Sequence, residues 1–93
     1  MSSEYFDPSL SHLIPVYLKR READLVQLEQ CLEGSDFEGV YEIGHKIKGT
    51  ALNYGFGILG EIGVKLENAS RQRDEAGLKE AIVDFQLFLK KSA

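Results

Sequence analysis

Apolar residues recur every three or four positions along almost the whole chain, which is the spacing of amphipathic helices. The first such stripe covers residues 10–14 and follows Asp7 and Pro8. Aspartate suits the N-cap of a helix and proline its first position, so we expect a short helix here. Pro15 then kinks or restarts this element, because proline has no N–H to donate. No stretch alternates between apolar and polar residues as a β-strand would.

Two longer stripes follow in the first half of the chain. One runs from residue 16 to Gly34, and glycine is a natural C-terminal stop. Ser35 and Glu38 match the capping-box pattern, in which the serine is the N-cap and the glutamate lies three positions later. They predict the start of a second helix, which we expect to end at Gly55.

Two further stripes cover residues 59–69 and 78–89. Gly60 and Gly63 lie in the first of them, where the lack of a side chain would let two helices approach closely. Asp74 precedes the second and is a candidate N-cap. Both segments are therefore expected to be helices that bury one face.

Four amphipathic helices with short connections predict an all-α fold, an antiparallel four-helix bundle with a short additional N-terminal helix. The chain has 93 residues, so we expect a single domain over residues 1–93. A chain of this length can bury only a modest core, and much of each helix must stay at the surface.

The charge balance argues against a nucleic-acid partner. The net charge is −4, with 11 basic against 15 acidic residues, whereas such binders usually carry a basic patch. The densest basic cluster, Lys19–Arg20–Arg21, is followed at once by Glu22 and Asp24. We interpret this mixed run as a solvated helix face.

Neither a membrane span nor an export signal is evident. No apolar run approaches the roughly 20 residues that a bilayer requires, and no basic region followed by an apolar stretch opens the chain. Cys31 is the only cysteine, so no intramolecular disulfide can form, and we expect it in the core. These features favour a cytoplasmic protein without a membrane partner, and a monomer is the simpler expectation for a saturated bundle.

The segment around His45 carries the candidate chemistry. Because helical residues advance about 100° each, His45 lies at the flank of the buried stripe, where its ring can reach solvent. Lys48 and Gly49 lie one turn later on the same face. Tyr41 lies one turn earlier and Leu52 two turns later, so the five residues form a strip along the helix.

These residue types suit a nucleophile that receives a phosphoryl group. Neutral imidazole is nucleophilic near neutral pH, because the unperturbed pKa of histidine is about 6.5. The ammonium of Lys48 can approach the phosphoryl oxygens and stabilise their charge. Gly49 in mid-helix costs about 1 kcal/mol relative to alanine, and clearance for a docking protein would explain its presence.

The residues from His45 to Thr50, His-Lys-Ile-Lys-Gly-Thr, resemble the phosphoacceptor motif of histidine phosphotransfer domains, including those of chemotaxis-type kinases. Downstream, Tyr54-Gly55-Phe56, Leu59 and Leu66-Glu67 are similar to the continuation of that family through the next helix. The resemblance covers the chain from about Asp7 to Leu89 and is weaker before Ser35 and after Arg71.

The resemblance implies a phosphoryl carrier rather than a stand-alone enzyme. The phosphoryl group would arrive from an aspartyl phosphate on a response-regulator receiver domain, stay on His45, and pass to a second receiver. Mg²⁺ would belong to the receiver, and this chain would hold no cofactor and no metal. Tyr41, Lys46 and Leu52 are the candidates for contact with the partner, which is a receiver or a hybrid sensor histidine kinase.

A metal site is a weaker interpretation of the same helix. Glu42 and His45 fit the Glu-x-x-His pattern of di-iron bundles, but such sites need two of these motifs. The other histidine, His12, is preceded three positions earlier by Ser9. We therefore expect His12 to be structural or exposed to solvent.

Two alternatives for the function stay open. A helical adaptor of the same fold would bind receiver or kinase domains without being phosphorylated. The chain could instead be a domain of a larger hybrid or chemotaxis kinase, with an ATP-bound kinase domain as the donor. The start at Met1 and the absence of linker sequence favour a free-standing protein.

Overall fold

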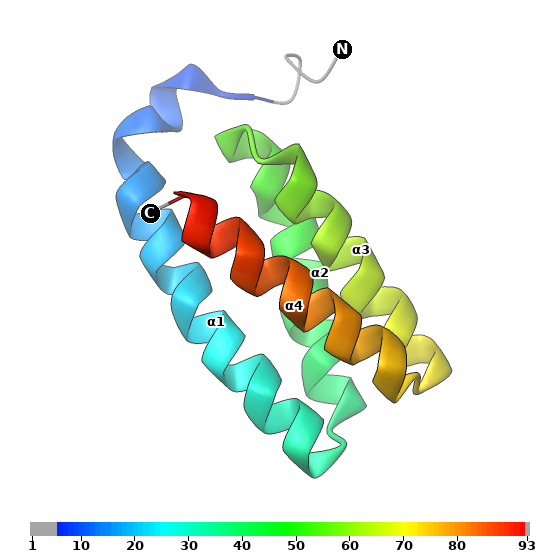
Figure 1. Cartoon of the computed structure of the whole chain (residues 1–93). Coiled ribbons are helices and arrows are strands. Elements are labelled where there is room, and N and C mark those ends of the chain that lie inside the picture. Colours follow the sequence, from blue (N-terminus) through cyan, green and yellow to red (C-terminus); the bar gives the residue numbers. More distant parts are fainter. Residues whose placement is uncertain (1–5, 93) are drawn as a thin grey trace.

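The computed structural model describes residues 6–92 and is helical throughout that range apart from short connections (Figure 1). The elements, in chain order, are η2 (Pro8–Leu13), α1 (Ile14–Gly34), α2 (Phe37–Ala51), η3 (Leu52–Tyr54), α3 (Gly57–Gln72) and α4 (Glu75–Ser92), where η marks a 3-10 helix. The predicted all-α antiparallel bundle with a short additional N-terminal helix is confirmed.

The four long helices form a ring around one core. α1 and α3 do not share an extensive contact, and each packs against both α2 and α4. The side chains that are fully buried come from all four helices and include Leu28, Ile47, Leu66 and Phe85. Cys31 is buried among them, as the sequence predicts. No helix in the described range is both long and apolar enough to cross a membrane.

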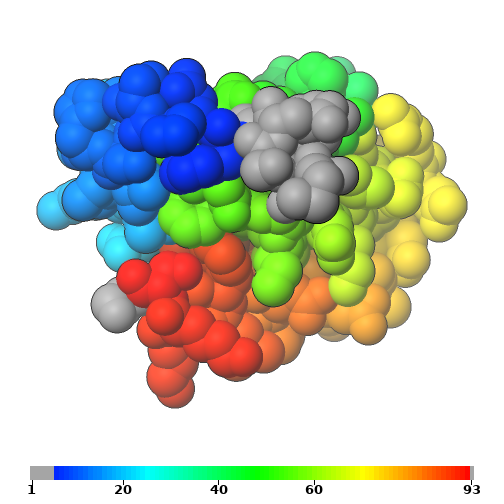
Figure 2. Space-filling view, turned by 90° about the horizontal axis from the view of Figure 1, so that it is seen from above, coloured from blue at the N-terminus to red at the C-terminus, as the bar shows by residue number. Residues whose placement is uncertain are grey.

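The N-terminal segment covers one end of the bundle. Asp7 caps η2, since its carboxylate accepts the backbone N–H of Ser9 at 3.0 Å. Its own N–H donates to the carbonyl of Asn53 at 3.0 Å, which ties this segment to the connection between α2 and α3. Figure 2 views this end and shows the N-terminal residues (blue) beside that connection (green). Pro15 lies in the first turn of α1. Of the two expected outcomes, a kink or a restart, the structure therefore shows the restart.

Two predicted helix boundaries were wrong by a few residues. Ser35 is not the N-cap of α2: it adopts a left-handed φ of 54° and ends α1. Asp36 is the N-cap, and its carboxylate accepts the N–H of Gly39 at 3.0 Å. Ser35 is the left-handed residue that turns the chain after Gly34. The N-cap of α2 is therefore the next residue, Asp36.

The second boundary is the end of α2. Its α-helical part stops at Ala51, and the last turn tightens into η3 before Gly55, whose φ is 84°. Tightening of a final turn into a 3-10 helix is common at helix ends. The predicted cap of α4 is confirmed, because Asp74 accepts the N–H of Gly77 at 2.9 Å.

α2 and α3 approach closely enough for their backbones to touch. A Cβ added to Gly63 would lie 2.7 Å from the backbone nitrogen of Lys48, and one added to Gly44 would lie 2.7 Å from Cβ of Leu66. Only glycine fits such positions. Gly60 does not share this role, since its nearest neighbour would lie at 3.8 Å. The close approach brings the side chains that follow Gly63 on α3 beside the middle of α2.

The expected solvated face around Lys19–Arg20–Arg21 was also wrong in part. Arg21 and Asp24 are only 6% and 4% exposed. Nε of Arg21 donates to Asp24 at 2.7 Å, and the guanidinium lies 4.5 Å from the centre of the Tyr17 ring. A charged pair can be buried when each partner satisfies the other, and the sequence alone does not reveal this pairing.

Candidate functional site

His45 lies in the middle of α2 and presents its ring to solvent. Its side chain is 63% exposed, although Gly44 and Ile47 beside it are buried. This is the flank position that the helical spacing predicts. The imidazole is therefore accessible to a second protein while its backbone is held against the core.

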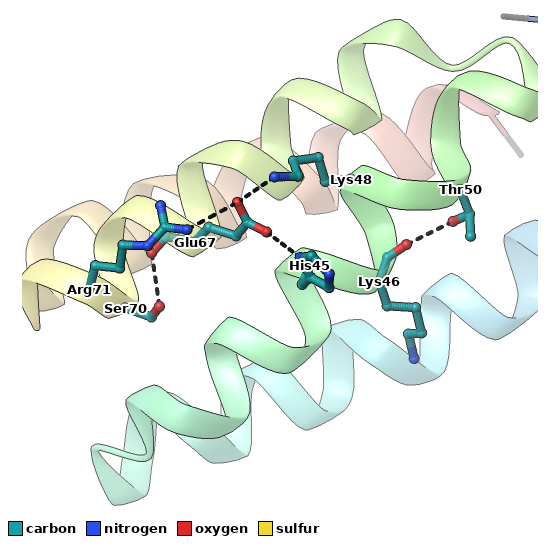
Figure 3. Close-up of polar contacts among 7 residues, drawn as sticks. All are labelled: His45, Lys46, Lys48, Thr50, Glu67, Ser70 and Arg71. Atoms are coloured by element: carbon teal, nitrogen blue, oxygen red, sulfur yellow. Dashed lines mark hydrogen bonds and ion pairs between the residues drawn. The ribbon is translucent and has the colours of Figure 1, made fainter.

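A buried carboxylate on α3 orients the ring. Glu67, whose side chain is 3% exposed, lies 2.8 Å through Oε2 from Nδ1 of His45 (Figure 3). An ionised carboxylate can only accept, so Nδ1 must carry the proton. Nε2 then holds the lone pair, and it makes no hydrogen bond with any residue in the described range. In the neutral ring, this tautomer leaves the lone pair on the outer nitrogen.

Sequence reasoning assigned no role to Glu67. It enters only through the Leu66-Glu67 pair that carries part of the family resemblance. One signal is present, because Glu67 is the one charged residue among the buried positions of α3. Buried acids are almost always paired, so this position points to a cationic or hydrogen-bonding partner on a neighbouring helix.

Lys48 holds the second oxygen of the same carboxylate. Its Nζ donates to Oε1 of Glu67 at 3.0 Å, and Nη2 of Arg71 lies 4.0 Å from that oxygen. Burial would raise the pKa of Glu67, but hydrogen bonds and charge from Lys48 and His45 outweigh it and lower the pKa. Glu67 therefore stays ionised at neutral pH, and Lys48 is bound to it rather than free in solvent.

Tyr41 and Arg71 extend this group along the surface. The Tyr41 ring stacks on the imidazole one turn away, with ring centres 5.7 Å apart and planes 13° apart. The guanidinium of Arg71 lies 5.3 Å from the centre of the Tyr41 ring. Tyr41 thus contacts the imidazole directly, and Arg71 is a cation near the site that the sequence analysis did not single out.

The other predicted positions differ in their surroundings. A Cβ at Gly49 would meet no atom within 4 Å, so the surface beside His45 is open there. Lys46 extends to the opposite side of α2 and donates to Asp24 of α1 at 2.9 Å. Leu52 is half-buried and packs opposite Gly60. The structure thus brings Tyr41, Lys48 and Gly49 together around His45, whereas Lys46 faces α1.

Nothing in the described residues resembles a metal centre. Over residues 6–92, no three His, Cys, Asp or Glu side chains gather into a group that could hold a metal ion. His12 is exposed in η2, as expected.

Comparison with known families gives a match to the Hpt domain over residues 12–91. Searches of curated proteins and of solved structures gave no significant match. The matched range includes α1, α2 and α3, all of α4 except its last residue, and the whole group around His45. Hpt domains are phosphotransfer modules of two-component phosphorelays, generally carriers rather than stand-alone enzymes, and they interact with receiver domains and kinases. This chain belongs to the Hpt domain family.

Proposed function

We propose that this chain carries a phosphoryl group on Nε2 of His45 and exchanges it with the aspartate of receiver domains. The observation that carries the proposal is the pairing of an exposed imidazole with a buried, ionised carboxylate. Nδ1 donates to Glu67 at 2.8 Å, so the lone pair lies on the outer nitrogen. A nucleophile that serves another protein needs this combination of access and fixed tautomer.

Each transfer forms one bond and breaks one. The lone pair of Nε2 forms the N–P bond while the P–O bond to the receiver's aspartate breaks, and its electron pair stays on the departing carboxylate. The imidazole keeps its Nδ1 proton and becomes positively charged. That charge faces the carboxylate of Glu67, which stabilises the phosphorylated ring. Because the reverse step uses the same atoms, the carrier can load and unload.

The cations around Glu67 can neutralise the charge of the phosphoryl group after it has been transferred to His45. A phosphoryl group adds between about one and a half and two negative charges near neutral pH. Side chains of Lys48 and Arg71 are 43% and 58% exposed, so both can shift toward its oxygens without leaving a buried position. Lys48 then has two roles: it holds Glu67 before transfer and balances phosphoryl charge afterwards.

The rest of the machinery belongs to the partner. Mg²⁺ and the acidic pocket for in-line transfer lie in the receiver, and this chain supplies no cofactor. A hybrid sensor histidine kinase is a second candidate donor. Tyr41, Lys46 and Leu52 are candidates for the docking surface around His45, and the carrier acts as a cytoplasmic monomer.

Chemical phosphorylation with phosphoramidate tests the site without knowledge of the natural donor. We expect the wild-type protein to gain one acid-labile, base-stable phosphoryl group, which phosphorus NMR should place on Nε2. His45→Gln should gain none. His12→Gln is the matched control, because His12 is also exposed but lies in η2, and it should behave as the wild type.

Transfer to receivers tests the second half of the proposal. The labelled protein is incubated with purified receiver domains encoded in the same genome, and label should move to an aspartate of at least one of them. Label on His45→Gln would refute the assignment of the site. A receiver that binds both proteins equally, with no label on either, would support the non-phosphorylated adaptor instead.

A further inference from the structure

A second surface feature lies on the α1 side of His45, around Lys46. A hollow of roughly 460 Å³ opens between the first half of α1 and the second half of α2. Its apolar wall is formed by Leu13, Val16 and Tyr54. Leu13 and Val16 are 38% and 51% exposed, which leaves apolar surface available to a partner.

The remaining wall of this pocket is cationic. Arg20, Arg21 and Lys46 line it, and no acidic side chain does. Asp24 binds both Arg21 and Lys46, at 2.7 and 2.9 Å, but it lies beneath them and is only 4% exposed. The surface that a partner meets is therefore positive. Arg20 has no ion-pair partner among the described residues.

A ring of contacts fixes the shape of the pocket. Asp24 holds Lys46 and Arg21, and the Arg21 guanidinium lies over the Tyr17 ring. The hydroxyl of Tyr17 shares a hydrogen bond with that of Thr50 at 2.8 Å, and Thr50 donates to the carbonyl of Lys46 at 3.0 Å. The ring closes on itself, so the pocket is formed before any partner binds. Preformed surfaces lose little conformational entropy on binding.

α2 carries the proposed phosphoacceptor and also contributes Lys46 and Thr50 to the wall of the pocket. Lys46 directly follows His45, and the two side chains leave α2 on opposite sides (Figure 3). Lys46 turns toward α1, and His45 turns toward Glu67 of α3. A receiver that reaches Nε2 must therefore lie over the helix that borders the pocket.

We propose that this pocket selects the receiver, and that it accepts an apolar side chain of the receiver next to an aspartate or glutamate that pairs with Arg20. The inference rests on the proposed exchange with receivers and names the chemistry that a cognate receiver must present. Charge complementarity at an interface contributes mainly to partner choice and to the rate of encounter. The α3 side of His45 supports the reaction, and the α1 side recognises the partner.

A charge reversal on the rim tests this inference, and its neighbour provides the control. Arg20→Glu changes the pocket, whereas Lys19→Glu makes the same change in net charge at an exposed residue that does not line it. The receiver that the wild type phosphorylates most efficiently serves as the probe. We expect Arg20→Glu to raise the KM for that receiver about tenfold, equivalent to about 1.4 kcal/mol, with kcat unchanged. Lys19→Glu should stay within about twofold.

Two further measurements make the result decisive. Phosphoramidate should label both variants as fast as the wild type, because neither substitution touches the group around Glu67. An Asp→Arg or Glu→Arg exchange on the receiver surface should restore transfer from Arg20→Glu. Equal KM values for the two variants would overturn the inference, and so would a loss of phosphoramidate labelling confined to Arg20→Glu. If His45 accepted no label from any donor while Arg20→Glu still weakened receiver binding, the proposed function would fail and the docking inference would not.

Discussion

At the scale of single residues, Gly49 weakens the helix but leaves open space for the proposed transfer. It lies in the last turn of α2, just before the chain continues into η3, is exposed, and has no positive φ. A Cβ there would meet nothing within 4 Å. The fold does not need glycine at this position, although glycine weakens a helix by about 1 kcal/mol relative to alanine. The need for open space comes from outside the chain, from a partner that approaches His45 one turn away.

Substitution of Gly49 should therefore separate stability from transfer. We expect Gly49→Ala to raise the free energy of unfolding by about 0.5–1 kcal/mol, measured by urea denaturation. Gly49→Gln should keep the helix content of the wild type but slow transfer from a phosphorylated receiver by about tenfold or more, because the longer side chain displaces the partner. Gly57→Gln, at an exposed glycine with equally open surroundings, should leave transfer unchanged. Wild-type transfer rates in Gly49→Gln would disprove the clearance argument.

The residues around His45 differ in how far the sequence could predict them. Lys48 and Gly49 follow His45 by three and four positions, and helical geometry alone places them on the same face. Glu67 comes from another helix, so its contact with His45 depends on the pairing of α2 with α3. Arg21 was misjudged for the same reason: a basic residue near acids looks solvated until the packing of α1 is known.

At the scale of elements, the contact between α2 and α3 builds the site. The two helices touch backbone to backbone through Gly44 and Gly63. Glu67 follows Gly63 by four residues, one turn along α3, and this places it beside His45. If the helices were moved apart by the thickness of a methyl group, a 2.8 Å hydrogen bond would become too long to exist.

Gly63→Ala should damage the fold and the site together. Its Cβ would lie 2.7 Å from the nitrogen of Lys48 and 2.8 Å from the carbonyl oxygen of Gly44, and neither backbone atom can yield alone. We expect a loss of about 1–3 kcal/mol in the free energy of unfolding, measured by urea denaturation. Nitrogen NMR of the imidazole should also show a mixture of tautomers. Gly60→Ala is the control and should be at least as stable as the wild type, because its Cβ has ordinary contacts. Equal stability of the two variants would contradict the packing argument.

Helix number and order were predictable from the sequence, whereas some helix ends were not. The apolar periodicity reports which residues face the core, so it predicts the number and order of helices even when the predicted ends are wrong by a few residues. The start of α2 depended on a choice between Ser35 and Asp36, two adjacent residues that can both cap. The left-handed backbone of Ser35 and the hydrogen bond from the Gly39 N–H to the Asp36 carboxylate decide it. The change from α2 to η3 likewise depends on tertiary packing at that end of the bundle.

At the scale of the whole molecule, two buried carboxylates hold α2 from both sides. Asp24 of α1 binds Lys46, and Glu67 of α3 binds His45 and Lys48. Their side chains are only 5% and 3% exposed, so each would be destabilising without its cationic partners. The helix that carries the proposed phosphoacceptor is thus oriented by charge as well as by its apolar face.

The contribution of Glu67 makes the stability of the bundle depend on pH. The ordinary pKa of a glutamate is 4.5. Burial acts to raise the pKa of Glu67, but the hydrogen bonds and charges of Lys48 and His45 outweigh burial and lower it in the folded protein. Folding therefore favours the ionised form. This stabilisation is fully present above the pKa of the unfolded chain and is lost as the pH falls through the lower folded value.

Urea denaturation of the wild type and of Glu67→Gln, at about pH 7 and about pH 3, measures this contribution directly. The wild type should be the more stable protein at neutral pH, because glutamine cannot balance the charge of Lys48. The difference should shrink at acid pH, because this stabilisation declines as the pH falls below the pKa of the unfolded chain toward the lower folded value. Glu61→Gln, an exposed glutamate on the same helix, should follow the wild-type profile at both pH values. A gap between wild type and Glu67→Gln that stayed constant with pH would mean that Glu67 stabilises the bundle by its shape and not by its charge.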